Sequence, residues 1–245
     1  MNSRARVAAV LLLAACGGGS TTEGPPTDYA PNFVGQWSGT GTITVTGQGT
    51  YSESLILRLS KNGTNELLIA GVPDVCPDGS PLHATAQSAS TLSISYSCPG
   101  IKSGFCPSIV LQVSGSGTLS GTALSASVSG TLSGCGTSYA YSATFSGGPA
   151  TEGQSACLSR ASARCHRYFE CDSTNANNMF ANENSCLNAL AAYDDCASFS
   201  CPSGQSFDSA QSQTCLNDTN SLSCSQLLQY LPYSGPMSCW VSFCH

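Results

Sequence analysis

The distribution of cysteine constrains this chain more than any other feature of its sequence. Fifteen cysteines occur among 245 residues, and ten of them lie in residues 155–245. A content of roughly one cysteine in nine residues is typical of small exported domains that disulfides hold together. The ten are Cys157, Cys165, Cys171, Cys186, Cys196, Cys201, Cys215, Cys224, Cys239 and Cys244.

Four further cysteines lie in residues 28–148, and they are Cys76, Cys98, Cys106 and Cys135. Both groups are even in number, so we expect two units that each close their own disulfides. The spacing within the groups does not determine which cysteines pair. The fifteenth, Cys16, stands apart from both groups and belongs to the N-terminal segment.

The N-terminal segment carries the pattern of an export signal. Arg4 and Arg6 precede an apolar run over residues 7–15 that is too short to span a bilayer. The run ends in Leu13-Ala14-Ala15-Cys16, which resembles the lipobox of bacterial lipoproteins. That resemblance implies removal of residues 1–15, attachment of lipid to Cys16 and anchoring of the chain to a membrane.

Residues 16–27 are rich in Gly, Ser, Thr and Pro and lack apolar periodicity, which predicts a flexible tether. Gly18 stands where an aspartate would retain a lipoprotein at the inner membrane of Gram-negative bacteria, so the same resemblance implies the outer membrane. Without residues 1–15 the chain keeps six basic and fourteen acidic side chains, a formal net charge of −8. No basic cluster remains, so we expect no nucleic-acid partner.

Residues 28–148 alternate apolar and hydroxyl side chains, as in Leu92-Ser93-Ile94-Ser95-Tyr96. A period of two predicts strands with one buried and one wet face. Turn pairs such as Asn62-Gly63 separate about eight such strands, which favours an antiparallel meander closing into a barrel or sandwich. Gly35-Gln36-Trp37 resembles the Gly-x-Trp motif at the start of lipocalin-like barrels, which implies the barrel.

The inward-facing side chains of this domain have two interpretations. They line a space for a small apolar ligand, or they fill an ordinary core. The candidate lining residues are Leu57, Leu92, Ile94, Tyr96, Leu111, Tyr139 and Tyr141.

Beyond a linker at residues 149–154, the apolar period changes to that of helices. We predict four short helices, at about 155–171, 183–198, 207–217 and 222–230, with Asn182 and Asp208 as N-caps. Isolated helices of this length are unstable in water, so disulfides between them should hold the domain together.

The C-terminal spacing resembles a cysteine-rich helical segment of uncharacterised exported lipoproteins from myxobacteria. The matching pattern is Cys165-x5-Cys171, Cys186, Phe207-Asp208-x6-Cys215, Cys224 and Cys239. This resemblance implies an architecture and an extracytoplasmic address, and it implies no activity.

Motifs for catalysis and metal binding are missing from the sequence. It contains no Gly-x-Ser-x-Gly and no Cys-x2-Cys, and His83, His166 and His245 do not stand at metal-ligand spacing. We therefore expect no metal and no cofactor, and a non-enzymatic lipoprotein of structural or partner-binding role. The alternatives are a carrier of lipid or another small apolar ligand within the β domain, and an inhibitor of secreted enzymes or a hydrolase.

Overall fold

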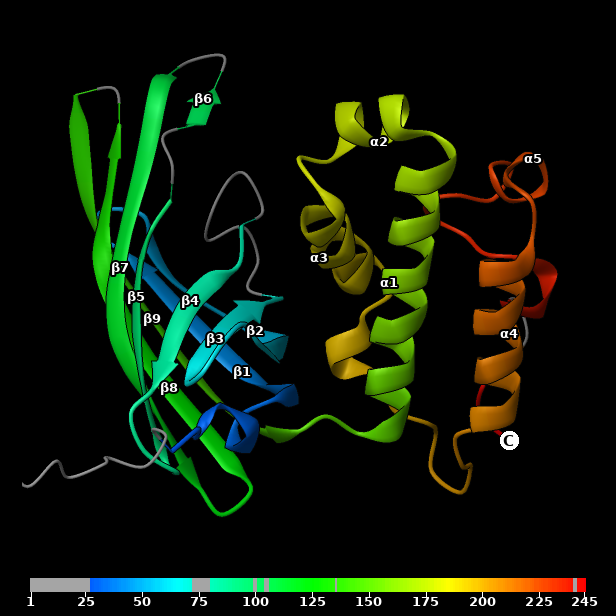
Figure 1. Ribbon diagram of the computed structural model, residues 1–245, viewed down its shortest axis with the longest axis horizontal. Helices are drawn as coiled ribbons and strands as arrows, with labels where there is room; N and C mark the ends of the chain where they lie inside the picture. The colour runs from blue at the N-terminus through cyan, green and yellow to red at the C-terminus, as the bar shows by residue number, and fades with distance from the viewer. Residues whose placement is uncertain (1–26, 72–79, 99–100, 104–105, 135, 240–241) are drawn as a thin grey trace, which may run out of the picture.

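The computed structural model describes residues 27–71, 80–98, 101–103, 106–134, 136–239 and 242–245. An N-terminal β-barrel and a C-terminal helical region lie side by side (Figure 1). The predicted Cys16 and its tether to residue 26 fall outside the described residues. The strands are β1 (Gly35–Val45), β2 (Gly49–Lys61), β3 (Glu66–Ala70), β4 (Leu82–Ala86), β5 (Thr91–Ser97), β6 (Ile101–Ser103), β7 (Cys106–Ser120), β8 (Ala123–Gly134) and β9 (Thr137–Pro149).

Eight of these strands form a closed antiparallel barrel. Their order is β5-β4-β3-β2-β1-β9-β8-β7, and β7 pairs again with β5 from Thr91↔Thr118 to Ser97↔Gln112, which closes the ring. The short strand β6 pairs with the start of β7. The predicted antiparallel meander is confirmed, and of the two architectures considered the chain forms the barrel.

Glycines allow the long strands to coil tightly enough for closure. Gly115 of β7 and Gly130 of β8 occupy inward positions, because their neighbours Val113 and Val128 belong to a cluster around the core. A Cβ atom at Gly130 would overlap the carbonyl of Gln112, and one at Gly115 would overlap that of Ser127. Glycine in a strand commonly marks such close backbone approach.

Apolar side chains fill the barrel, and the chain before β1 closes one end of it. The 3-10 turn η1 (Ala30–Asn32) leads into Phe33, and both Ala30 and Phe33 are fully buried in the core. Trp37 lies beside them and donates its Nε1 hydrogen to the carbonyl oxygen of Phe33 at 2.9 Å. The rest of this core is Leu55, Leu57, Leu59, Leu67, Ile69, Leu82, Ala84, Ala86, Leu92, Ile94, Leu124 and Phe145.

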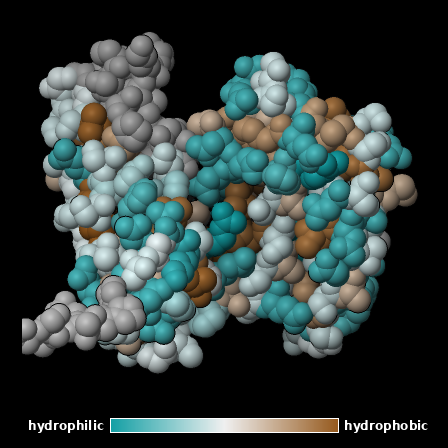
Figure 2. All heavy atoms as spheres, in the orientation of Figure 1, coloured by the Kyte–Doolittle hydropathy of each residue, from teal (hydrophilic) through white to brown (hydrophobic). Residues whose placement is uncertain are grey.

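The outward face of the barrel carries mostly hydroxyl side chains. Pale and teal spheres therefore cover most of the barrel in the view of Figure 2. Along β7, for example, Leu111 and Val113 are buried while Gln112 and Ser114 are exposed. An apolar interior with a polar exterior is the reverse of the arrangement in barrels that span membranes, where the apolar band faces outward.

The helical region is built around one long helix. Its elements are α1 (Glu152–Cys171), α2 (Ser173–Met179), α3 (Glu183–Tyr193), η2 (Cys196–Ser198), α4 (Ser209–Ser221), α5 (Cys224–Leu227) and η3 (Met237–Cys239). α3 and α4 both pack against α1. None of the helices in the described part of the chain is long and apolar enough to cross a membrane.

Five disulfides staple this region, and three of them start on α1. They are Cys157–Cys196, Cys165–Cys186, Cys171–Cys224, Cys201–Cys244 and Cys215–Cys239. Cys98 of the barrel is also disulfide-bonded. Cys76 and Cys135 lie outside the described residues, and the side chain of Cys106 is not described.

The predicted helices differ from the observed ones mainly at their ends. The N-caps Asn182 and Asp208 are confirmed, since each side chain accepts from the backbone three residues on. The first helix begins three residues early, because Thr151 and Gln154 form a capping box. The second ends at Tyr193 instead of 198, because Asp195 adopts a left-handed conformation with φ of 51°.

Two further corrections concern helix number and length. α2 was not among the four predicted helices; the Asp172 side chain caps it by accepting from the backbone of Asn175 at 3.2 Å. The predicted helix at 222–230 is four residues long, Cys224–Leu227, and turns follow it.

The barrel and the helical region share an apolar contact. Ile56 of β2 points outward and packs in one cluster with Leu158, Leu187 and Leu190. Beside it, Gln154 donates its Nε2 hydrogens to Ser38 Oγ at 2.9 Å and to the Ala197 carbonyl at 2.6 Å. These contacts fix the helical region against β1 and β2.

Candidate functional site

The candidate lining residues of the barrel interior differ in burial, and three of them meet at a small cavity in the described part of the barrel. Leu57, Leu92, Ile94 and Leu111 are buried, Tyr96 and Tyr141 are half-buried, and Tyr139 is 37% exposed. Leu57, Ile94 and Tyr141 meet at an apolar cavity of about 60 Å³, while the other four line no part of it. Burial raises the pKa of Tyr141.

Pockets for small molecules usually measure about 300–1,000 Å³, so this cavity is several times too small. Of the candidate lining residues, Leu57, Leu92 and Ile94 belong to the main apolar cluster of the barrel, and Leu111 belongs to a second one.

One group of potential metal ligands converges among the described residues. It comprises Cys157, Asp194 and Cys196. The two sulfurs are bonded to each other in a disulfide, so they do not serve as thiolate ligands. Of the histidines, His166 faces Glu183 with Nδ1 3.3 Å from Oε1, and His245 faces Asp208 with Nε2 3.7 Å from Oδ2. His83 lies on the barrel, apart from both.

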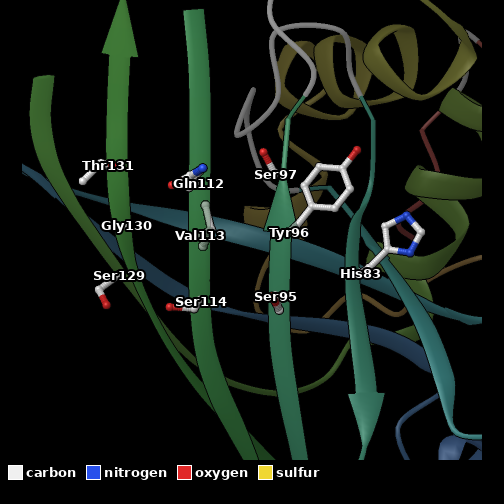
Figure 3. Close-up of a pocket in the computed structure, with 10 residues that line it drawn as sticks. All are labelled: His83, Ser95, Tyr96, Ser97, Gln112, Val113, Ser114, Ser129, Gly130 and Thr131. Carbon is white, nitrogen blue, oxygen red and sulfur yellow. The ribbon is translucent and has the colours of Figure 1, made fainter. Parts of the chain in front are cut away.

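An open hollow lies on the outer surface of the barrel, across β8, β7, β5 and β4 (Figure 3). It is an open groove of about 810 Å³. None of the ten described residues that line it is an aspartate, glutamate, lysine or arginine. They are His83, Ser95, Tyr96, Ser97, Gln112, Val113, Ser114, Ser129, Gly130 and Thr131.

The register of the strands sets the polar side chains of this groove in rows. Ser95, Ser114 and Ser129 are direct neighbours on β5, β7 and β8. In the next row, Ser97, Gln112 and Thr131 are neighbours in the same way. Adjacent strands lie about 4.8 Å apart and alternate residues about 7 Å apart, so these groups form a regular two-dimensional grid.

The hydroxyls of the two groove rows make no side-chain hydrogen bonds among the described residues, whereas some hydroxyl pairs elsewhere on the barrel do. On β1 and β2, Thr42 Oγ1 lies 2.9 Å from Ser52 Oγ, and Thr44 Oγ1 lies 3.0 Å from Thr50 Oγ1. Among the described residues, no such side-chain bond involves the six polar groups of the two groove rows. Their donors and acceptors are therefore available to a ligand.

Two stacked rings stand at the β4 side of the groove. The imidazole of His83 and the phenol ring of Tyr96 have centroids 5.1 Å apart and planes 9° apart. His83 is exposed, and Tyr96 is half-buried and also packs on the core. The groove thus combines flat ring surface with uncharged hydrogen-bonding groups, as Figure 3 shows.

The sequence predicts a hydroxyl-rich outward strand face in this part of the chain but not the groove itself. The alternation in Ser93-Ile94-Ser95-Tyr96-Ser97 predicts a wet face of serines. Strand curvature hollows that face, and strand order brings His83 beside Tyr96; neither has a signature in the local sequence. The one sequence signal for the site is a histidine, His83, on the polar face of β4, followed along the chain by the strand β5, which contains Tyr96.

Comparison with known proteins gives two structural similarities, both with low TM-scores. No family model matches the chain, and no curated protein matches it. A “putative outer membrane protein” from Bacteroides fragilis is similar over 49% of this chain, with 15% identity and a TM-score of 0.33. The match spans about half of that protein, 52% of its length. A redesigned β-barrel is similar over 48% of this chain and 92% of its own, with 18% identity and a TM-score of 0.26.

Proposed function

We propose that this chain is an exported, outer-membrane lipoprotein, anchored through lipid on Cys16, that binds a neutral glycan in the groove of its barrel. The observation that carries the glycan proposal is the stacked pair His83 and Tyr96 beside two rows of unpaired hydroxyl and amide groups. We place binding, and no turnover, at this groove.

The chemistry of the groove suits a sugar better than the other ligands considered. Sugar rings present hydroxyls that both donate and accept, and serine, threonine and glutamine do the same. Their apolar C–H faces pack on aromatic rings. A charged ligand would find no aspartate, glutamate, lysine or arginine among the described lining residues to pair with it. A lipid chain would contact hydroxyl groups instead of apolar side chains.

The shape of the groove favours a chain over a single sugar. It crosses four strands and is open to solvent, so successive sugar units can lie along it (Figure 3). A neutral polysaccharide of the cell envelope or its surroundings is the ligand class that fits.

Affinity electrophoresis of the purified, oxidised chain in gels that contain dextran, xylan or glucomannan tests the glycan proposal. We expect at least one of these neutral polysaccharides to retard the native chain. His83→Ala and Gln112→Ala together should weaken that retardation about tenfold or more, since each lost hydrogen bond is worth about 0.5–1.5 kcal/mol.

Thr44→Ala with Thr50→Ala is the matched control, because that pair occupies the same outward face away from the groove. The control should migrate like the native chain in every gel. Absence of retardation in all neutral polysaccharides, or equal retardation of the groove variant, rules out the glycan proposal. Retardation by a protein or an acidic polysaccharide alone would assign the groove to another ligand.

The anchor is tested separately in a Gram-negative host. We expect the native chain to partition with membranes and to carry acyl chains on an N-terminal Cys16. Cys16→Ala should leave the chain unlipidated. A native chain whose N-terminal peptide retains Met1 and has no added acyl mass contradicts the anchor and leaves the glycan proposal untouched.

A further inference from the structure

A second hollow lies inside the helical region. It has a volume of about 320 Å³, is partly open to solvent, and is lined by residues that include members of α1, α4 and the C-terminal segment. Two disulfides contribute to its wall, Cys157–Cys196 and Cys215–Cys239, and Phe199 and Phe243 contribute aromatic surface.

Arg164 of α1 lines this pocket with most of its side chain buried. Its Nη2 pairs with the carboxylate of Asp194, and its Nη1 donates to the carbonyl oxygen of Tyr233 at 3.3 Å. Its third nitrogen, Nε, is buried and has no hydrogen-bond partner in the described structure, and the same holds for Nε of Arg58 and of Arg167.

Arg160 lies one turn earlier on the same face of α1 and lines the same pocket. Its Nη1 donates to Ser212 Oγ at 2.8 Å, and its guanidinium carbon lies 4.0 Å from the centroid of the Phe243 ring. No carboxylate pairs with it among the described residues. Burial lowers the pKa of Arg160 to about 10, so it stays positively charged at neutral pH.

The charges that line the pocket do not balance. Arg160 and Arg164 supply two positive charges, and Asp194 supplies one negative charge. This local excess of positive charge occurs in a chain whose formal net charge is −6. Arg160 is half-buried and has no carboxylate partner among the described residues, so the lining of the pocket carries one positive charge without a matching negative one.

We propose that this pocket binds a small organic anion through its carboxylate or phosphate group. The planar fork of Arg160 suits a two-oxygen head group bound side by side. The aromatic rings and disulfide sulfurs suit a short apolar body, and 320 Å³ is at the lower end of small-molecule pockets. This site is remote from the barrel groove, and the proposal does not depend on glycan binding.

Titration calorimetry on the full, oxidised chain with benzoate, phenyl phosphate, acetate and inorganic phosphate tests it. Sodium chloride holds the ionic strength constant, since exposed charges respond to salt in any case. We expect benzoate or phenyl phosphate to bind at one site. Weaker binding of acetate and inorganic phosphate would show that the apolar body contributes, and comparison of the two aromatic probes identifies the preferred head group.

Arg160→Gln should weaken binding at least tenfold, and Arg160→Lys should weaken it less. Lys61→Gln removes the same charge from an exposed side chain of the barrel and should bind like the native chain. Absence of binding by all four probes overturns the proposal. Equal affinity of Arg160→Gln and the native chain overturns it too.

Ser212→Asp provides a second test that leaves Arg160 in place, for the case in which the Arg160 variants do not fold. Ser212 Oγ already accepts from Arg160 Nη1, so a carboxylate at this position would pair with Arg160 and remove the positive charge that the ligand would meet. We expect a folded protein with its five described disulfides and with probe binding reduced at least tenfold. A folded Ser212→Asp chain that binds the probes as well as the native chain contradicts the site.

Discussion

Arg164 and Asp194 form an ion pair that joins the middle of α1 to the C-terminal cap of α3. The Arg164 side chain is 8% exposed and that of Asp194 is 25% exposed. Because the pair is mostly desolvated, its two members depend on each other: removal of one leaves the other as a poorly compensated charge.

Asp194→Ala should therefore destabilise the protein by about 3 kcal/mol or more, the usual cost of breaking a buried pair. Guanidinium unfolding of the oxidised chain measures this loss. The double variant Arg164→Met with Asp194→Ala should be less destabilised than Asp194→Ala alone, because no charge is then stranded. If the double variant is less stable than Asp194→Ala alone, the contact between Arg164 and Asp194 does not stabilise the protein through charge pairing.

Disulfide removal should destabilise the helical region in order of loop length. Cys171–Cys224 closes a separation of 53 residues and Cys165–Cys186 one of 21. The chain-entropy relation gives about 4 kcal/mol for the first and about 3 kcal/mol for the second. Unfolding of the two Cys→Ala double variants under oxidising conditions compares them. A larger loss for Cys165–Cys186 would mean that its burial outweighs the loop entropy.

The periodic parts of the fold were predictable from the sequence. Leu92-Ser93-Ile94-Ser95 was predictable as a strand, because alternating apolar and polar residues place all the apolar side chains on one face of an extended chain. Asn182 and Asp208 were identifiable as N-caps, because capping depends on local backbone and side-chain geometry. Local chemistry therefore sets the elements and most of the helix starts.

The sites were not predictable in the same way, because they depend on contacts between distant residues. Asp195 adopts a left-handed conformation just after α3. Glycine is the usual sequence signal for such a turn, and this position is not a glycine. In the sequence, Arg160 and Arg164 look like part of an ordinary solvent-exposed face of α1. Only the packing of α4 and the C-terminal segment places them at a pocket. His83 and Tyr96 become a ring pair only through the pairing of β4 with β5.

Acid should loosen the N-terminal closure of the barrel through Asp28. Its carboxylate accepts from Lys61 Nζ, from the Asn65 backbone at 3.0 Å and from the Ala30 backbone at 3.2 Å. These bonds, that with Lys61 first, hold the pKa of Asp28 below its ordinary value of 3.8. A lowered folded-state pKa contributes stability above 3.8 that is lost as the pH falls through the folded-state value.

Asp28→Asn should therefore be less stable than the native chain at neutral pH, and the difference should shrink as the pH falls below about 4. Thermal unfolding between pH 7 and pH 2.5 measures it. Glu53→Gln is the control, an exposed carboxylate of the barrel without a described ion pair. A stability difference for Asp28→Asn that grows toward low pH would contradict the direction of the shift.

The contact at Ile56 should couple the two halves of the molecule. Leu55-Ile56-Leu57 interrupts the alternation of β2, because Leu55 and Leu57 face the barrel core while Ile56 is buried under the helices. Loss of a buried isoleucine side chain costs about 2–5 kcal/mol. Ile56→Ala should remove that stabilisation from the interface and leave the barrel core intact.

Scanning calorimetry should then show the barrel and helical region unfolding at more widely separated temperatures in Ile56→Ala than in the native chain. Proteolysis between β9 and α1, at residues 149–151, should become faster as the regions separate. Ser52→Ala changes the same outward face of β2 at an exposed position and should leave both measurements unchanged. If Ile56→Ala instead lowers both transitions together, Ile56 supports the barrel itself, and the rigid placement of the helical region comes from Gln154 and its bonds to Ser38 and Ala197.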